Sequence, residues 1–297
     1  MTKDTILSNA SSGADSTETA FSWSAPREDV SVIFSSPHSG RHYPDAFRKL
    51  LRVPLEDLRR VEDAYVDQLF SDVTDFGAGF LSAVYARSYV DLNRSETELD
   101  SRMFRDGPPT PAGERSPRVE AGLGCIPRIA ASGEDIHARK LTRKEADARL
   151  ALAYSPFHAH LSHALEEIHA RMGHSVLIDC HSMPSVVGGR RTKADIVLGN
   201  RYGASCDDAL VRRIEDNFTR LGYRVLRNVP YAGGYLTQKH GSPLEDRHAI
   251  QIEINRRLYM DEAEVTPSRG FEKLRHDLMC VAQNILAWAE TKKSRAQ

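Results

Sequence analysis

Residues 175 to 184, Ser-Val-Leu-Ile-Asp-Cys-His-Ser-Met-Pro, constrain the fold of this chain more than any other stretch. Their β-branched and aliphatic residues predict a buried strand, which ends in polar residues and Pro184. Asp179 and His181 are two residues apart, so their side chains point to the same face of that strand. Because ligands of open α/β sheets bind at the carboxyl ends of strands, we expect a functional site here.

Two other segments have a similar form. The strand predicted at residues 30 to 35 runs into Pro37-His38-Ser39-Gly40, and the apolar run at residues 249 to 254 contains Glu253. A single histidine at a strand end is more often a structural residue that bonds a carbonyl group. Two histidines and a carboxylate at buried strand ends instead favour a metal-dependent hydrolase.

Predicted strands alternate with predicted helices along the chain, whose 297 residues suffice for one large domain or two smaller ones. We expect strands at residues 30 to 35, 80 to 91 (one or two strands), 176 to 178, 195 to 199, 223 to 226 and 249 to 254. We expect helices at residues 55 to 76, 141 to 172 (with a break near Ser155-Pro156), 207 to 221 and 270 to 290. This order predicts an α/β fold: a single domain with a mixed, mostly parallel sheet and helices on both faces.

The predicted domain covers residues 21 to 290, between a disordered lead at residues 1 to 20 and a frayed tail at residues 291 to 297. Residues 95 to 135 are rich in proline, glycine and charge and predict a long excursion from the domain. The glycines of residues 233 to 241 predict a flexible loop.

Composition excludes several classes of protein. A formal net charge of -1 provides no basic field for nucleic acid or an anionic membrane. No apolar stretch approaches the roughly 20 residues of a membrane helix, and the amino terminus lacks an apolar signal core. The four cysteines form no Cys-x-x-Cys pair, so we expect reduced thiols and a cytoplasmic protein. No feature predicts an oligomeric state.

His38, Asp63 and His181 are the candidate metal ligands. A catalytic zinc site commonly uses three protein ligands and keeps one position open, and two imidazoles with one carboxylate suit it. Glu62 is a rival for the carboxylate, and Asp63 alone could be a surface residue of its predicted helix. Asp179 could orient the imidazole of His181. One zinc ion is expected, although another divalent transition metal fits the same ligands.

The histidines of residues 158 to 169 are a weaker candidate for a metal site. Residues 160 and 163 share one face of the predicted helix, but residue 158 is turned away from residue 160.

Glu253 is the candidate general base, because Ile250, Ile252 and Ile254 would surround it with apolar surface and raise its pKa. The alternative is a strand carboxylate that faces solvent or pairs with Arg257.

Several arginines flank predicted strand ends and suggest an acidic substrate, because a guanidinium group binds carboxylates with two parallel hydrogen bonds. They are Arg87, Arg94, Arg256 and Arg257, with Asn93 as a polar helper. Each of them alone is more often part of a surface ion pair. Gly233 and Gly234 could let their loop close over a substrate, or could form only a turn.

Serine or cysteine catalysis is the weaker interpretation. The chain has no Gly-x-Ser-x-Gly elbow. Gly124-Cys125 and Cys180-His181 are suggestive, but neighbouring residues of a strand point to opposite faces.

At this point the chain resembles the N-formylglutamate amidohydrolase family, which is distantly related to zinc carboxypeptidases and aspartoacylases. The resemblance covers about residues 30 to 262 and consists of ordered pieces. These pieces are Pro37-His38-Ser39-Gly40, Glu62-Asp63-Ala-Tyr-Val-Asp67, Arg87 with Val90-Asp-Leu-Asn-Arg94, Asp179-Cys-His181-Ser182, Asp195-Ile-Val-Leu-Gly199, Gly233-Gly-Tyr235, and Gln251-Ile-Glu253 through Arg257-Leu-Tyr-Met260.

The resemblance implies a phosphorylase/hydrolase-like α/β fold, zinc held by His38, Asp63 and His181, and Glu253 as the general base. It implies hydrolysis of N-formyl-L-glutamate to formate and L-glutamate, a late step of histidine breakdown in some bacteria. The substrate-binding candidates are then Arg87, Asn93, Arg94, Gly234 and Arg257.

The chain departs from the family pattern in two places. Glu62-Asp63-Ala64 stands where these deformylases tend to have Thr-Asp-Trp, and residues 103 to 128 carry their own proline-rich sequence. Such loops set a substrate pocket. The alternatives are therefore a zinc hydrolase of another N-acyl amino acid or small peptide, and a binding relative without catalysis.

Overall fold

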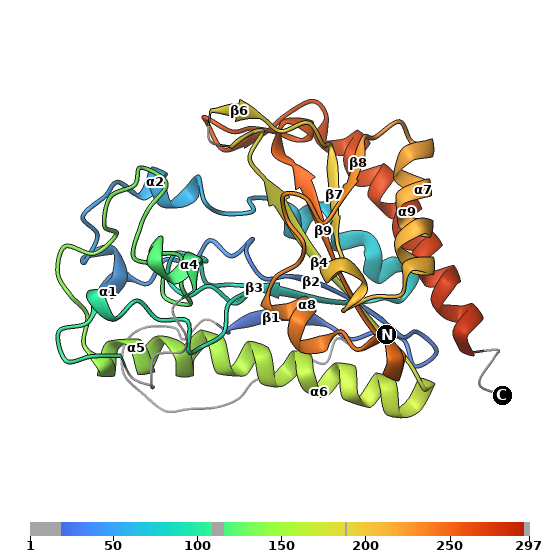
Figure 1. The fold of residues 1–297 in the computed structure, drawn as a ribbon, viewed down its shortest axis with the longest axis horizontal. Helices are drawn as coiled ribbons and strands as arrows, with labels where there is room; N and C mark the ends of the chain where they lie inside the picture. Colours follow the sequence, from blue (N-terminus) through green and yellow to red (C-terminus); the bar gives the residue numbers. More distant parts are fainter. Residues whose placement is uncertain (1–18, 109–115, 188, 294–297) are drawn as a thin grey trace.

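A seven-stranded sheet runs through the protein (Figure 1). The computed structural model describes residues 19–108, 116–187 and 189–293. The strand order is β1 (Phe21–Ser24), β3 (Gly79–Ala83), β2 (Val32–Ser36), β4 (Ser175–Met183), β9 (Arg247–Asn255), β7 (Ile196–Gly199) and β8 (Val225–Arg227). β1 is antiparallel to β3 and β7 to β9, whereas the other neighbours are parallel, which confirms the predicted mixed, mostly parallel sheet.

Helices cover both faces of the sheet, as predicted (Figure 1). α7 (Asp208–Arg220) and α9 (Phe271–Lys293) pack on one face, against Val176, Ile178 and other even-numbered residues of β4. α6 (Ser155–Met172) packs on the opposite face, where Leu177 is buried. Alternating aliphatic side chains of the central strands therefore serve two separate cores.

The predicted helix of residues 55 to 76 is wrong. The structure has α2 (Leu55–Arg59), α3 (Val66–Leu69) and a 3₁₀ helix (Ser71–Phe76) in its place. Between α2 and α3, the backbone N–H of Asp63 donates to the carbonyl of His38 at 3.0 Å, and Tyr65 has a left-handed φ of 66°. One long helix and these shorter helices would both bury residues at spacings of three and four. The periodicity therefore did not reveal that Asp63 lies outside a helix.

Other boundaries also differ from the prediction. β3 ends at Ala83 rather than near residue 91, and the glycine-rich segment after residue 233 contains α8 (Tyr235–His240) rather than a loop. α5 (Arg143–Arg149) continues through a π-helical turn (Leu150–Tyr154) into α6 without a break, with Pro156 in the first turn of α6. Inside a continuous helix a proline removes one N–H donor, and the π-helical turn just before Pro156 is the local adjustment that accommodates it.

The remaining elements are short. They are α1 (Asp45–Arg48), 3₁₀ helices (Ser101–Met103, Arg201–Gly203, Pro243–Glu245 and Arg256–Leu258), α4 (Pro117–Glu120), and the paired strands β5 (Val186–Val187) with β6 (Arg190–Arg191) and β10 (Met260–Asp261) with β11 (Thr266–Pro267).

Most of the expected lead and tail lies outside the described residues, but residues 291 to 293 continue α9 beyond the predicted limit. In the part of the chain that the structure describes, we find no helix with the length and hydropathy of a membrane span.

Candidate active site

β4 and β9 bring four polar side chains to one face of the sheet. In their parallel register Asp179 lies beside Gln251 and His181 beside Glu253. These side chains share the face of Leu177 and Ala249, because residues two apart in a strand point the same way. The isoleucines at positions 250, 252 and 254 point into the opposite core, so the prediction that they surround Glu253 is wrong.

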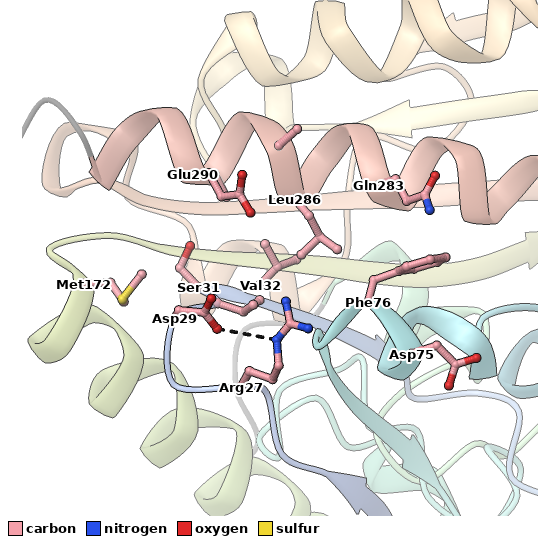
Figure 2. Close-up of a pocket in the computed structure, with 13 residues that line it drawn as sticks. Arg27, Asp29, Ser31, Val32, Asp75, Phe76, Met172, Gln283, Leu286 and Glu290 are labelled. Atoms are coloured by element: carbon pink, nitrogen blue, oxygen red, sulfur yellow. Dashed lines mark ion pairs between the residues drawn. The ribbon is translucent and has the colours of Figure 1, made fainter.

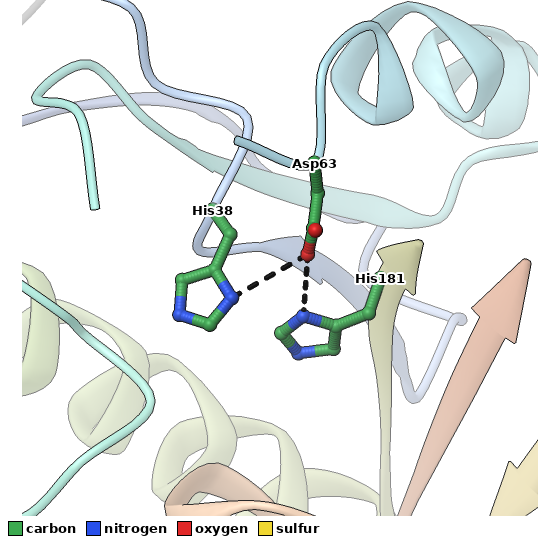
Figure 3. Close-up of side chains that lie close together, drawn as sticks. All are labelled: His38, Asp63 and His181. Atoms are coloured by element: carbon green, nitrogen blue, oxygen red, sulfur yellow. Dashed lines mark hydrogen bonds and ion pairs between the residues drawn. The ribbon is translucent and has the colours of Figure 1, made fainter. Parts of the chain in front are cut away.

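His38, Asp63 and His181 meet at this face, and all three side chains are buried (Figure 3). His38 follows the end of β2, Asp63 comes from the segment between α2 and α3, and His181 is in β4. One ligand atom from each lies within 4.8 Å of the other two. The carboxylate oxygen Asp63 Oδ2 is 3.4 Å from His38 Nδ1 and 2.9 Å from His181 Nδ1.

Two further carboxylates orient the imidazoles. Nε2 of His38 is 2.6 Å from Asp91 Oδ1, and Nε2 of His181 is 2.9 Å from Asp179 Oδ2. With a metal ion bound, a proton on each Nε2 would donate to its carboxylate and leave the Nδ1 lone pairs for the ion, beside Asp63 Oδ2. Carboxylates commonly hold metal-binding histidines in this way. The structure thus assigns Asp179 the orienting role expected for it, and adds Asp91.

The charge of the cluster also suits a cation. Burial alone would raise the pKa of Asp63, but the adjacent His181 and His38 hold that pKa well below its usual range. Burial alone would lower the pKa of His181, but Asp179 and Asp63 hold it well above its usual value. The surrounding carboxylates therefore stabilise positive charge between His181 and Asp63, from a proton or a metal ion.

The donor set fits zinc. His38 Nδ1 is buried and lacks a hydrogen-bond partner among the described residues, so it is available as a ligand. Ligand atoms about 2 Å from a tetrahedral zinc ion lie about 3.3 Å from one another. Asp63 Oδ2 lies 3.4 Å from His38 Nδ1 and 2.9 Å from His181 Nδ1, which is close to this value. Three protein ligands would leave one position open, as in catalytic zinc sites.

Glu62 points away from this cluster, so Asp63 rather than its neighbour is the candidate ligand. The hydroxyl of Tyr43 donates a hydrogen bond to the Glu62 carboxylate. Burial raises the pKa of Glu62 to about 7.

Arg256 holds Asp63 in position. Its Nη2 donates to Asp63 Oδ1 at 3.1 Å and to the carbonyl of Glu62 at 2.7 Å, and its Nη1 donates to the carbonyl of Arg60. Arg256 was one of the arginines expected near strand ends, but it was not among the predicted substrate-binding residues. The two adjacent arginines have equivalent sequence contexts, and only the turn after β9 distinguishes them.

Arg257 is not brought to the site. Its guanidinium group is half exposed, pairs with Asp195 and is absent from the pocket wall. The choice between Arg256 and Arg257 as the arginine near the site was therefore wrong.

Glu253 presents one free carboxylate oxygen. Gln251 Nε2 donates to Glu253 Oε1 at 2.6 Å, whereas the buried Oε2 has no hydrogen-bond partner among the described residues. Burial raises the pKa of Glu253 to about 7, opposed by His181 and Arg87. A carboxylate with a pKa near neutrality suits proton transfer.

A pocket of about 440 Å³ opens over these residues. Its wall contains the three candidate ligands, Glu253 and the predicted substrate-binding residues Arg87, Asn93, Arg94 and Gly234. The excursion contributes Arg118, Leu123, Pro127, Ile129 and Ala131. The first three belong to residues 103 to 128, the segment predicted to shape a substrate pocket, and Ile136 and Tyr231 also line the wall. Arg118 and Tyr231 were not among the predicted site residues, because neither belongs to a recognisable motif.

A second pocket, of about 310 Å³, lies near the start of β2 and beside α9 (Figure 2). Its lining contains no histidine or cysteine, and Arg27 is already paired with Asp29 at 3.5 Å. Its carboxylates, Asp29, Asp75 and Glu290, do not form a group that could hold a metal ion among the described residues.

His158 has a structural contact rather than a metal. Its Nε2 is 3.0 Å from the carbonyl of Leu92 and helps to hold the loop that carries Asp91 and Asn93. Among the described residues, only His38, Asp63 and His181 form a group that could hold a metal ion.

The polar atoms of Asn93 are engaged within the protein. Nδ2 donates to Asp179 Oδ2 at 3.0 Å and lies 2.9 Å from His181 Nε2, while Oδ1 accepts from the N–H of Leu236 at 2.8 Å. Gly234 packs closely against this amide, because an added Cβ would lie 2.4 Å from Asn93 Nδ2. These contacts make Asn93 a positioning residue for Asp179 and His181.

We expect Gly234→Ala to displace Asn93 and lower kcat/KM roughly tenfold, as is usual when a residue that orients a metal ligand is disturbed. Steady-state kinetics would measure this, with Asn93→Ala and the double variant for comparison. The double variant should be no worse than the worse single variant. Fully additive losses would contradict an effect through Asn93.

Comparison with known proteins agrees with the resemblance found in the sequence. The family profile described as N-formylglutamate amidohydrolase matches residues 30–260. The N-formylglutamate deformylase of Pseudomonas putida is 29% identical over 277 residues, which cover 89% of this chain and 95% of that protein. The deformylase of Pseudomonas aeruginosa is 28% identical over 273 residues, covering 88% of this chain and 95% of that protein.

A solved structure extends the agreement to three dimensions. The crystal structure of N-formylglutamate amidohydrolase from Ralstonia eutropha JMP134 superposes with a TM-score of 0.83 and 35% identity, covering 91% of this chain and 97% of that chain. Both the sequence pattern and the α/β architecture are therefore shared over most of the chain, and the protein belongs to the N-formylglutamate amidohydrolase family.

Proposed function

We propose that this amidohydrolase uses one zinc ion to hydrolyse N-formyl-L-glutamate to formate and L-glutamate. The observation that carries the proposal is the meeting of the His38–Asp63–His181 cluster with the free Glu253 oxygen in one arginine-lined pocket. The substrate named for the related deformylases supports the same reaction. From the family resemblance we also infer a role in histidine breakdown, and from the reduced cysteines a cytoplasmic location.

The reaction needs a nucleophile, a proton carrier and a means of holding the substrate. Water adds to the formyl carbon, the bond between that carbon and the amide nitrogen breaks, and formate and an amine leave. A bound zinc ion would polarise the formyl oxygen and make the attacking water more acidic. Glu253 accepts the water proton at Oε2 and passes it to the leaving nitrogen, as a general base and then a general acid.

The other residues keep this arrangement rigid. Asp91 and Asp179 fix the two imidazoles, and Arg256 fixes the carboxylate of Asp63. Rigid positioning lowers the reorganisation needed in the transition state.

The first test is formate release from N-formyl-L-glutamate by chelator-treated protein, with and without added zinc. We expect little turnover without metal and restored turnover with about one zinc per chain. Turnover unchanged after complete metal removal would contradict the zinc site. Absence of turnover in folded, zinc-loaded protein would contradict this substrate.

A further inference from the structure

Five arginines line the active-site pocket, and their charges are not equally neutralised. Arg60 pairs with Asp57 at 3.1 Å, Arg87 with Asp91 at 2.9 Å and Arg256 with Asp63 at 3.1 Å. The other two, Arg94 and Arg118, have no ion pair with any described residue. Uncompensated cations in a pocket attract an anionic ligand.

Arg94 is half buried and held by backbone atoms. Its Nε donates to the carbonyl of Leu123 at 3.2 Å and its Nη1 to the carbonyl of Asn93 at 2.7 Å. Burial lowers the pKa of Arg94, Asp91 opposes that shift, and the charges of Arg118 and Arg87 add to it. Arg94 lines the pocket and its charge interacts with Asp91, the carboxylate that pairs with His38, so it belongs to the part of the pocket near the candidate metal ligands.

Arg118 belongs to α4 in the excursion and is exposed at the pocket rim. Ser116 caps this helix by accepting from the N–H of Val119 at 3.2 Å. The Ser116 hydroxyl also donates to Glu98, whose carboxylate accepts from the N–H of Ser95 as well. The helix is thus anchored, while the guanidinium group of Arg118 makes no hydrogen bond within the described chain.

The excursion also supplies an apolar wall to the same pocket, from Leu123, Pro127 and Ile129, and Ile136 directly after it adds to this wall. An apolar wall suits the methylene groups of a substrate side chain, and the arginines suit carboxylates. N-formyl-L-glutamate has an α-carboxylate close to its formyl amide and a second carboxylate two methylenes further along the side chain. The two unpaired arginines therefore match the number and order of these charges.

We propose that Arg118 binds the side-chain carboxylate of the substrate and so selects an acidic over a neutral N-formyl amino acid. Arg94, nearer the metal ligands, binds the α-carboxylate. This inference rests on the proposed function, because it assumes that the formyl group lies over the metal cluster. It assigns specificity to a segment whose proline-rich sequence departs from the family pattern.

The test compares N-formyl-L-glutamate with N-formyl-L-glutamine, which replaces only the distal carboxylate by a neutral amide. For Arg118→Met we expect KM for the acid to rise about tenfold with little change in kcat, since one charge-assisted contact made equally in the ground and transition states is lost. The kinetic constants for the amide should stay within about twofold. Arg118→Lys should recover part of the lost selectivity.

Arg105→Met is the matched control, because Arg105 is exposed on the same excursion and lies outside the pocket wall. It should behave as the wild type. Equal changes for both substrates in Arg118→Met, or no change, would overturn the proposal. If zinc-loaded wild-type protein cleaves neither compound, the proposed function fails. Calorimetry then tests Arg118 separately, through the dissociation constants of both intact compounds. In Arg118→Met, only the binding of the acid should weaken, by about tenfold relative to the wild type.

Discussion

The Glu253→Gln variant is expected to keep its fold and its zinc and to lose about 100-fold or more in kcat. Glutamine preserves the shape of the side chain and can still contact Gln251, but it cannot accept the proton of the attacking water. Loss of a general acid and base typically costs about 100-fold to 10,000-fold in rate. Formate release under saturating substrate, with zinc content measured on the same sample, would check both parts of this expectation.

Glu62→Gln is a stringent control. Both glutamates are buried, and burial raises the pKa of each to about 7, but only Glu253 lines the pocket. Glu62→Gln should therefore retain close to wild-type turnover. Unchanged kcat in Glu253→Gln would remove Glu253 from the mechanism.

The pH profile provides a second readout of the same residue. A base must be ionised to act, so kcat/KM should rise with pH through the pKa of Glu253 and then level off. Burial raises that pKa to about 7 in the protein alone. Because a bound cation favours the ionised form, the acid limb of the zinc enzyme should lie at or below about pH 7. Glu253→Gln should lose this limb.

His181→Ala is expected to lose both zinc and activity, with kcat/KM reduced more than about 1000-fold. The change removes one of three candidate ligands and leaves Asp63 and Asp179 buried without their shared imidazole. Metal supplies the Lewis acid of such a reaction, so its loss removes several kcal/mol of transition-state stabilisation. Zinc per chain after dialysis and formate release would be measured together.

Two variants keep this prediction interpretable. His174 is a buried histidine that bonds Ser31 Oγ at 2.7 Å and does not line the active-site pocket, so His174→Ala should retain zinc. Asp179→Asn keeps His181 but weakens its orientation, and should lower zinc affinity by about 10-fold to 100-fold. Full zinc occupancy and activity in His181→Ala would contradict the proposed ligand set.

The chain alone was sufficient to predict the architecture and the chemical groups of the site. Runs such as Val176-Leu177-Ile178 predicted buried strands, and the same alternation correctly placed Asp179 and His181 on one face. The ordered motifs correctly indicated the family. These inferences succeed because strand periodicity and residue chemistry are local properties that the sequence displays directly.

The way in which distant segments meet could be seen only in the tertiary structure. The break between α2 and α3 turns Asp63 toward the histidines and Glu62 toward Tyr43, and the turn after β9 directs Arg256 inward while Arg257 pairs with Asp195. Adjacent residues of like chemistry have nearly the same sequence signal, and long-range packing and hydrogen bonds determine which of them reaches the site. The partners of His38 and the unpaired charge of Arg118 likewise depend on contacts between segments far apart in the chain.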